Sequence, residues 1–231
     1  MNNNRNIRLD LIKAVAIIMV VVGHAIQFGC GADYTENLSF YDNWIYKIIY
    51  SFHMPVFMCV SGWLFARSIE KYDTCTLLKN KAMALLLPIV AWGTFHYIST
   101  KVILGHETPD LSTWWMIVGG GLWFLWALVY NMIVVVLIHR FLKDSLIVYA
   151  IVYLALFFIP NGWNCSSYIF MYPYFVGLYL LAQRKFDFSS LRTKRAIGIT
   201  VLMYLVLLVF YNRSSYIYES QYCIFGGTIH A

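Results

Sequence analysis

The stretch RLDLIKAVAIIMVVVGHAIQFGC, residues 8–30, decides how this chain folds. It is almost wholly apolar and long enough to cross a bilayer as one helix, which takes about 20 residues. Yet Lys13 lies near its start, and His24 lies well inside the apolar run. Eleven positions separate them, so on a helix the two side chains share one face, about 16 Å apart along the axis. Asp10 falls within about 40° of the same line. A polar stripe of this kind should face protein or a wet cavity, so we expect it to belong to an active site.

Two other interpretations of this stretch do not require an active site. His24 could simply hydrogen-bond to a neighbouring helix, with Lys13 and Asp10 as anchors at the membrane interface. The stretch could also be a secretory signal peptide, with Arg5 and Arg8 as its basic region. No small-x-small cleavage site follows it, so we predict an uncleaved helix.

The composition places the whole chain in a membrane. Of its 231 residues, 61% are hydrophobic and only 12% are charged, and the charges form short clusters between long apolar runs. This pattern predicts an all-α, polytopic membrane helix bundle, which we treat as a single domain over residues 1–231. The net charge of +6 then reflects loop charges and does not indicate nucleic-acid binding. The five cysteines show neither metal-ligand nor disulfide spacing, so we expect no metal site.

Seven apolar segments predict about seven transmembrane helices. They cover residues 11–30, 46–66, 83–104, 121–139, 145–160, 168–183 and 196–211. With the N-terminus in the cytoplasm, 14 of the 17 lysines and arginines fall in inner segments, as the positive-inside rule requires. Aromatic residues crowd the outer ends and predict a belt that consists mostly of membrane anchors. These residues are Tyr41, Trp44, Tyr46, Tyr50, Trp114, Trp115 and Trp163.

The second segment contains SFHMPVFMCVSGWLF, residues 51–65. His53 near its outer end and His24 in the outer half of the first segment lie at similar depth. Antiparallel neighbouring helices can therefore bring the two histidines together. Pro55 and the Ser61-Gly62 pair predict a kink and a close helix contact, because proline frees a carbonyl group and glycine lets backbones approach.

Lys79 and Lys81 lie just ahead of the third segment. These lysines could be ordinary positive-inside anchors. Alternatively, they could bind an anionic group such as a phosphate at the cytoplasmic entrance of the site. Glycines 119–121 predict a flexible or tight entry to the fourth segment, and Trp123 follows them near the outer surface. We expect His96 to be a polar residue that packs inside the bundle. His106 and His139, in or beside loops, need no role.

Four stretches, in this order, resemble the acyltransferase-3 family of integral membrane O-acyltransferases, especially its bacterial sugar O-acetyltransferase branch. They are RLDLIKAVAIIMVVVGH with Lys13 and His24, SFHMPVFMCVSGWLF, Lys79-Asn80-Lys81 through Pro88, and LWFLWALV from Leu122. Family members often carry arginine where this chain has Lys13, Lys79 and Lys81. Lysine keeps the charge but lacks the planar fork that binds phosphate through two hydrogen bonds. Members also usually have more spans than seven, so we expect a truncated or interrupted copy as one possibility.

The resemblance implies transfer of an acetyl or other short acyl group from a cytoplasmic donor, typically acetyl-CoA, to a hydroxyl of a cell-envelope carbohydrate. The expected location is the bacterial inner membrane, with acyl-CoA, a carbohydrate acceptor and the bilayer as partners and no bound cofactor. A hydroxyl is a poor nucleophile until a base removes its proton, and histidine titrates in the right range. His24 is therefore the expected base, and His53 would position the acceptor or assist proton transfer. A covalent acyl-histidine intermediate fits equally well.

The other candidate residues are expected to bind substrate. Asp10 and Lys13 would line the donor path, and Lys79 and Lys81 would meet the phosphates of coenzyme A. Trp123 would offer an aromatic face to a sugar. Two other classes stay open: a transporter or exporter that uses the histidines as a relay, and a non-catalytic membrane scaffold.

Overall fold

A computed structural model describes residues 7–29, 40, 42–105, 108–159, 165–186 and 190–209. Within these ranges the chain is helical and contains no strand. The elements are α1 (Ile7–Phe28), α2 (Trp44–Lys71), α3 (Thr74–Tyr97), the π-helix η2 (Ile98–Ile103), α4 (Leu111–Gly120), α5 (Trp123–Leu142), α6 (Leu146–Leu156), α7 (Cys165–Gln183) and α8 (Leu191–Val209). The expected all-α helical fold is confirmed.

Helices α2, α3 and α4 each begin at a polar residue whose side chain caps the first turn. Asn43 accepts hydrogen bonds from the N–H groups of the residues after it in α2, and Asp73 does the same for α3. Asp110 caps α4, where hydrogen bonds from the Ser112 hydroxyl and from the Thr113 N–H and hydroxyl hold the pKa of its carboxyl well below the usual value. Each cap satisfies N–H groups that have no partner inside the helix.

Helices α3 and α4 differ most from the sequence-based expectation. Helix α3 begins at Thr74 and not near residue 83, so Lys79 and Lys81 lie inside the helix instead of ahead of it. The capping Asp73 explains the earlier start, because a cap can begin a helix before its apolar face begins. Helix α4 was not predicted. It ends in the glycine run, and Leu122 follows with φ 46°, in the left-handed region, so the entry to α5 is a tight turn.

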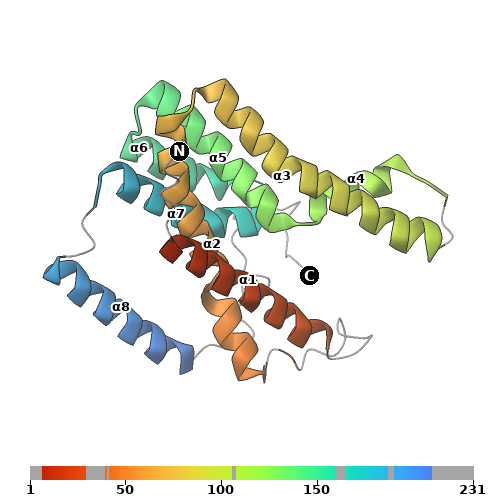
Figure 1. Ribbon diagram of the computed structural model, residues 1–231, viewed down its shortest axis with the longest axis horizontal. Coiled ribbons are helices and arrows are strands. Elements are labelled where there is room, and N and C mark those ends of the chain that lie inside the picture. The colour runs from red at the N-terminus through yellow and green to blue at the C-terminus, as the bar shows by residue number, and fades with distance from the viewer. Residues whose placement is uncertain are drawn as a thin grey trace.

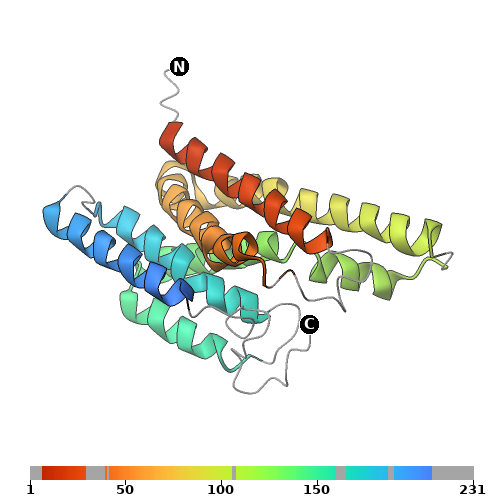
Figure 2. The ribbon, with the colours of Figure 1, turned by 90° about the horizontal axis from the view of Figure 1, so that it is seen from below.

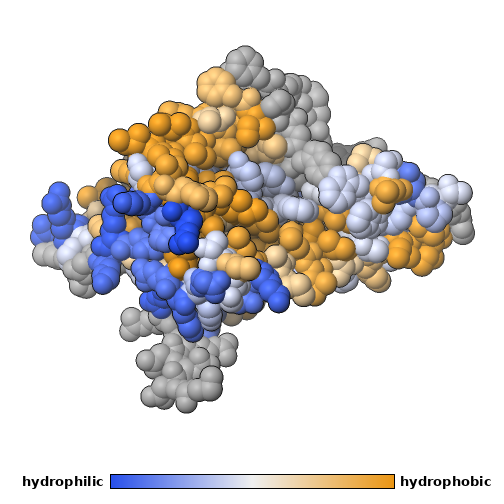
Figure 3. All heavy atoms as spheres, turned by 90° about the horizontal axis from the view of Figure 1, so that it is seen from above, coloured by the Kyte–Doolittle hydropathy of each residue, from blue (hydrophilic) through white to orange (hydrophobic). Residues whose placement is uncertain are grey.

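Much of the surface is apolar, as a membrane protein requires. Four helical stretches are long and apolar enough to cross a bilayer: Asp10–Phe28, Trp44–Lys71, Thr74–Ile103 and Trp123–Leu142. Figure 3 shows a broad apolar surface on one face, with hydrophilic residues gathered toward one end. Helices α6, α7 and α8 coincide with the last three predicted spans. Seven crossings and a cytoplasmic N-terminus stay predictions.

Helix α2 holds the bundle together. It packs most extensively against α7, and α1 packs against it as well. Figures 1 and 2 show α2 at the centre, with α1 and α7 on opposite sides of it. At Gly62 a Cβ atom would lie only 2.1 Å from the carbonyl oxygen of Phe175 in α7. The close helix contact expected at Ser61-Gly62 is therefore confirmed, and it sits in the main core.

Candidate active site

The contact between α1 and α2 forms around His24. Its Nδ1 lies 3.3 Å from the side-chain oxygen of Gln27 and 3.5 Å from the hydroxyl of Tyr50. The Tyr50 hydroxyl in turn donates to the same Gln27 oxygen at 3.3 Å. Phe28 stacks on the His24 ring with 5.8 Å between centroids. Residues of α1 and of α2 therefore both contact His24.

These contacts decide which ring nitrogen of His24 carries the proton. The Gln27 oxygen only accepts hydrogen bonds, and the Tyr50 proton already points to it, so both groups near Nδ1 are acceptors. The proton of the neutral ring therefore belongs on Nδ1. The lone pair is left on Nε2, which contacts no partner within the described residues. His24 is also exposed, so this lone pair is open to a substrate.

Tyr50 links the two histidines. Its ring meets His24 edge-on at 6.4 Å between centroids and lies 4.9 Å from the ring of His53. The two histidines lie close enough for their charges to interact, as their predicted depths suggested. Sequence reasoning placed Tyr50 among the membrane anchors and gave it no part in the site. Its spacing of three from His53 puts both on one face of α2, which is the signal that could have found it.

Gly23 makes room for this arrangement. A Cβ atom at Gly23 would lie 2.6 Å from the edge of the Tyr50 ring. Any larger residue would push the ring away from His24. The glycine just before the histidine is therefore part of the site, although the sequence analysis gave it no role.

His53 is the buried member of the cluster. Only 3% of its surface is exposed, and its Nδ1 lies 2.7 Å from the Ile49 carbonyl oxygen. A carbonyl only accepts, so Nδ1 carries the proton and Nε2 keeps a lone pair. The hydrogen bond fixes the ring along α2. His53 is thus oriented by its own helix, and its ring packs on that of Tyr50.

Two lysines, one on α1 and one on α3, form a second polar feature. Lys13 and Lys81 lie close enough for their positive charges to repel each other. Lys81 is half-buried and its Nζ lies 6.0 Å from the ring centre of Phe65. Neither lysine has a carboxylate partner among the residues that the structure describes. Two cations held together in this way favour an anionic ligand.

The remaining predicted residues are not drawn into these clusters. Lys79 is exposed, and Asp10 is partly buried on α1. Trp123 opens α5, where its ring meets Phe124 edge-on at 5.9 Å and packs against the apolar core. The structure shows no contact between Trp123 and the two histidines. Its role as a sugar platform stays a prediction.

An apolar cavity of about 510 Å³ adjoins the His24 cluster. Its walls come from α1, α3 and the turn between α4 and α5, and include Phe28, Trp92, Phe95 and His96. Phe28 lines this cavity and also stacks on His24. A substrate group in the cavity would therefore lie beside the proposed base. His96, expected as a packed residue, is exposed on the cavity wall.

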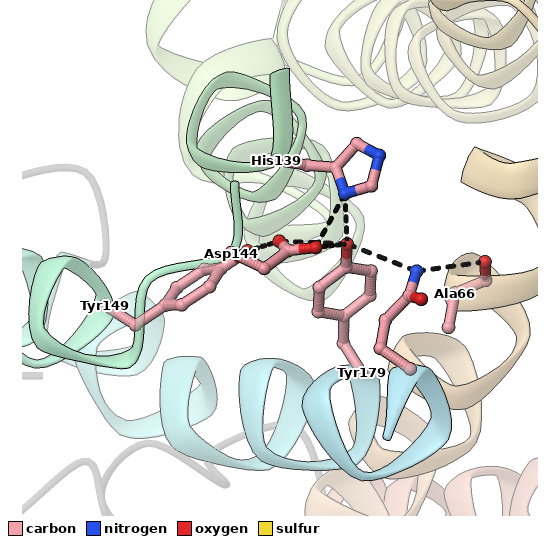
Figure 4. A network of polar contacts seen from close by, with 6 residues as sticks. Ala66, His139, Asp144, Tyr149 and Tyr179 are labelled. Carbon is pink, nitrogen blue, oxygen red and sulfur yellow. Dashed lines mark hydrogen bonds and ion pairs between the residues drawn. The ribbon is translucent and has the colours of Figure 1, made fainter. Parts of the chain in front are cut away.

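A third polar cluster lies at the opposite end of the helices. His139 Nδ1 lies 2.7 Å from Asp144, whose carboxylate also accepts hydrogen bonds from the hydroxyls of Tyr149 and Tyr179. Gln183 bonds to the Tyr179 hydroxyl and extends the network to α2 (Figure 4). The sequence analysis left His139 without a role. In the described part of the chain, no group of three potential ligands could hold a metal ion.

Comparison with known proteins settles the family. The model of the acyltransferase domain family matches residues 6–229. The chain belongs to this acyltransferase family. The four stretches on which the resemblance rests lie in α1, α2, α3 and the α4–α5 turn with the start of α5. Two of them contribute His24 and His53 to the cluster described above.

Two curated relatives are nodulation proteins. Nodulation protein NolL of Sinorhizobium fredii (strain NBRC 101917 / NGR234) is 30% identical over 191 residues, which cover 78% of this chain and 50% of that protein. Nodulation protein NolL of Mesorhizobium japonicum (strain LMG 29417 / CECT 9101 / MAFF 303099) is 30% identical over 188 residues, covering 78% of this chain and 49% of that protein. This acyltransferase-family chain thus spans about half the length of the curated relatives it matches. No solved structure matches it.

Proposed function

We propose that this chain is a membrane O-acyltransferase that moves an acetyl or other short acyl group from cytoplasmic acyl-CoA to a hydroxyl of a cell-envelope carbohydrate, in the bacterial inner membrane. The observation that carries the proposal is the environment of His24. Its Nδ1 is held by Gln27 and Tyr50, and its Nε2 has no partner among the described residues. Membership of the acyltransferase family supports the reaction type.

The chemistry follows from the tautomer of His24. Its Nε2 lone pair accepts the proton of the acceptor hydroxyl while the hydroxyl oxygen attacks the carbonyl carbon of the thioester. The carbon–sulfur bond then breaks, and the leaving thiolate takes the proton back from the imidazolium. The Gln27 oxygen and the Tyr50 hydroxyl face Nδ1–H and stabilise the ring as its charge develops. Direct attack of Nε2 on the thioester uses the same geometry. It breaks the carbon–sulfur bond, releases the thiolate and gives an acyl-histidine. The acceptor hydroxyl then takes the acyl group and passes its proton to the thiolate.

Lys13 and Lys81 fit the donor side of this reaction. Lys13 lies about 16 Å from His24 along α1, which is too far for both residues to contact the same atom. Their paired positive charge suits an anionic part of the donor, with its thioester carried farther toward His24. Lys79 and Asp10 would lie near the entrance of the same path, and Trp123 would contact the acceptor.

Acetyl transfer from radiolabelled acetyl-CoA in membranes tests the proposal. Wild type and His24→Ala would be compared at equal protein level, with Met203→Ala as the control because Met203 is an exposed residue of α8 that lines none of the cavities described above. We expect label in carbohydrate with the wild type and the control, and at least a hundredfold less with His24→Ala. Equal label with His24→Ala would exclude the base. Loss of substrate flux without any change in acetyl content would indicate a transporter instead.

A further inference from the structure

A cavity of about 350 Å³ lies where α2 ends, α3 begins and α5 ends. Its size falls in the usual range of small-molecule sites. Polar groups stand on its walls, among them Asp73, Thr74, Cys75, His139 and Arg140. By the predicted topology this end of the helices faces the cytoplasm, where acyl-CoA is found. The cavity is separate from the His24 cluster, which lies toward the other ends of α1 and α2.

The charges of the cavity favour a phosphate-bearing ligand. Arg140 has no carboxylate partner among the described residues, so its guanidinium is available to the ligand. Asp73, the one acid on the wall, is engaged with the N-terminus of α3 through the Thr76 N–H at 3.0 Å. Its negative charge is therefore compensated by the helix. Arginine binds phosphate through two hydrogen bonds more readily than other side chains do.

His139 lines this cavity, and its ring is held in place by Asp144. Its Nδ1 faces Asp144, and Figure 4 shows the other ring nitrogen on the far side of the ring. Asp144 and Lys143 both adopt positive φ values, 54° and 49°. Such backbone conformations are costly for these residues and persist where the surroundings enforce them. Here the hydrogen bonds of Asp144 to His139, Tyr149 and Tyr179 do so, which leaves Nε2 of His139 for a ligand.

Two more cavities lie farther along α3, beyond the polar cavity. Next to the polar cavity, a small apolar hollow of about 120 Å³ is lined by Lys81 and by residues 78–86 and 129–133. Lys81 lies one helical turn beyond Leu77, a wall of the polar cavity, or about 6 Å farther along α3. The apolar cavity beside Phe28 and His24 follows toward the other end of α3. A long ligand with a charged head and an apolar arm matches this order.

We infer that the cavity bounded by Cys75, His139 and Arg140 binds the phosphate-bearing nucleotide end of the acyl donor, with the donor's arm directed along the α3–α5 contact toward His24. This inference rests on the proposed acyl-CoA-dependent function. Arg140 binds a phosphate, and Nε2 of His139 hydrogen-bonds to the nucleotide. Lys81 then contacts the donor between its two ends. The phosphate of an anionic lipid headgroup could bind to the same residues. The experiment below distinguishes coenzyme A from such a lipid.

Cys75 provides a direct probe, since it is exposed and lines the cavity. A variant with Cys75 as its only cysteine would be reconstituted in neutral-lipid nanodiscs, and the rate of maleimide labelling would be measured. The ligand is desulfo-coenzyme A, which has no thiol to consume the reagent. We expect it to slow labelling about tenfold at saturation, and the desulfo form of the pantetheine arm alone to have no effect. Arg140→Gln should raise the concentration needed for protection about tenfold, whereas Arg67→Gln, an exposed arginine of α2 outside the cavity, should not.

Several results would overturn the inference. Labelling that desulfo-coenzyme A does not slow would place the nucleotide elsewhere. Protection by phosphatidylglycerol in the nanodisc without protection by desulfo-coenzyme A would assign the cavity to lipid headgroups. Equal protection in wild type and Arg140→Gln would remove Arg140 from the site, and Arg140→Lys shows whether the charge alone suffices. The assay needs no acceptor and no transfer, so failure of acetyl transfer and failure of protection are distinct results.

Discussion

Replacing Gly62 by alanine tests the contact on which the bundle is built. The new Cβ would lie 2.1 Å from the Phe175 carbonyl oxygen, 3.0 Å from its carbon and 3.2 Å from its Cα. Ordinary contact begins near 3.4 Å, so α7 must move away from α2 by about 1.3 Å. The obstacle is backbone, which cannot rotate aside as a side chain can. The displacement would loosen the packing of Phe65 on Phe175 and Tyr179, three of the most buried side chains.

The expected cost follows from two opposing effects. Overpacking of a core costs about 1–3 kcal/mol, and a backbone clash of this depth belongs at the upper end. Alanine recovers about 1 kcal/mol because it favours the helix more than glycine does. The net loss is therefore about 2 kcal/mol. For a chain of this length it lowers the melting temperature by about 4–8 °C.

Thermal unfolding in detergent, followed by intrinsic fluorescence at one scan rate, measures this loss. Gly177→Ala is the matched control, because a Cβ at Gly177 in α7 meets nothing within 4 Å. The control should melt at the wild-type temperature or slightly above it. A Gly62→Ala protein that melts with the control would refute the close α2–α7 contact.

Three further changes test the site and a helix cap. Tyr50→Phe removes the hydroxyl that faces His24 and should lower kcat of acetyl transfer about five- to tenfold with KM for acetyl-CoA unchanged; an unaltered kcat would exclude a role for the hydroxyl. Gly23→Ala should displace the Tyr50 ring and reduce transfer at least as much, whereas Gly198→Ala, which meets no atom within 4 Å, should not. Asp110 has a lowered pKa in the folded chain, so its stabilisation of α4 is complete above the unfolded pKa of about 4 and declines as pH falls below it. Hydrogen exchange in α4 should therefore be faster in Asp110→Ala than in wild type at pH 7, with a difference that shrinks at acid pH; a difference independent of pH would contradict the charged cap.

The sequence by itself determined the fold class and the face of each helix. Long apolar runs with few charges form helices in a membrane, because each backbone N–H and C=O group in lipid must be hydrogen-bonded within the segment. Helical periodicity placed Lys13 and His24 on one face of α1. In the structure Tyr50 of α2 lies beside His24, and Lys81 of α3 is near enough to Lys13 for their charges to interact. The boundary of α3 was misplaced because a single polar residue, Asp73, begins it ahead of the apolar run.

Only the tertiary structure decided which residues meet. Tyr50 reaches His24 across 26 positions of sequence, and Tyr179 reaches His139 across 40. Periodicity reports the direction of a side chain on its own helix, but the partner depends on how two helices cross and how closely they approach. That approach is set at points such as Gly23 and Gly62, where the absence of a Cβ atom lets another helix come near. The sequence therefore indicated the histidine that we propose as the base, and the packing of α1 against α2 placed Tyr50 beside it.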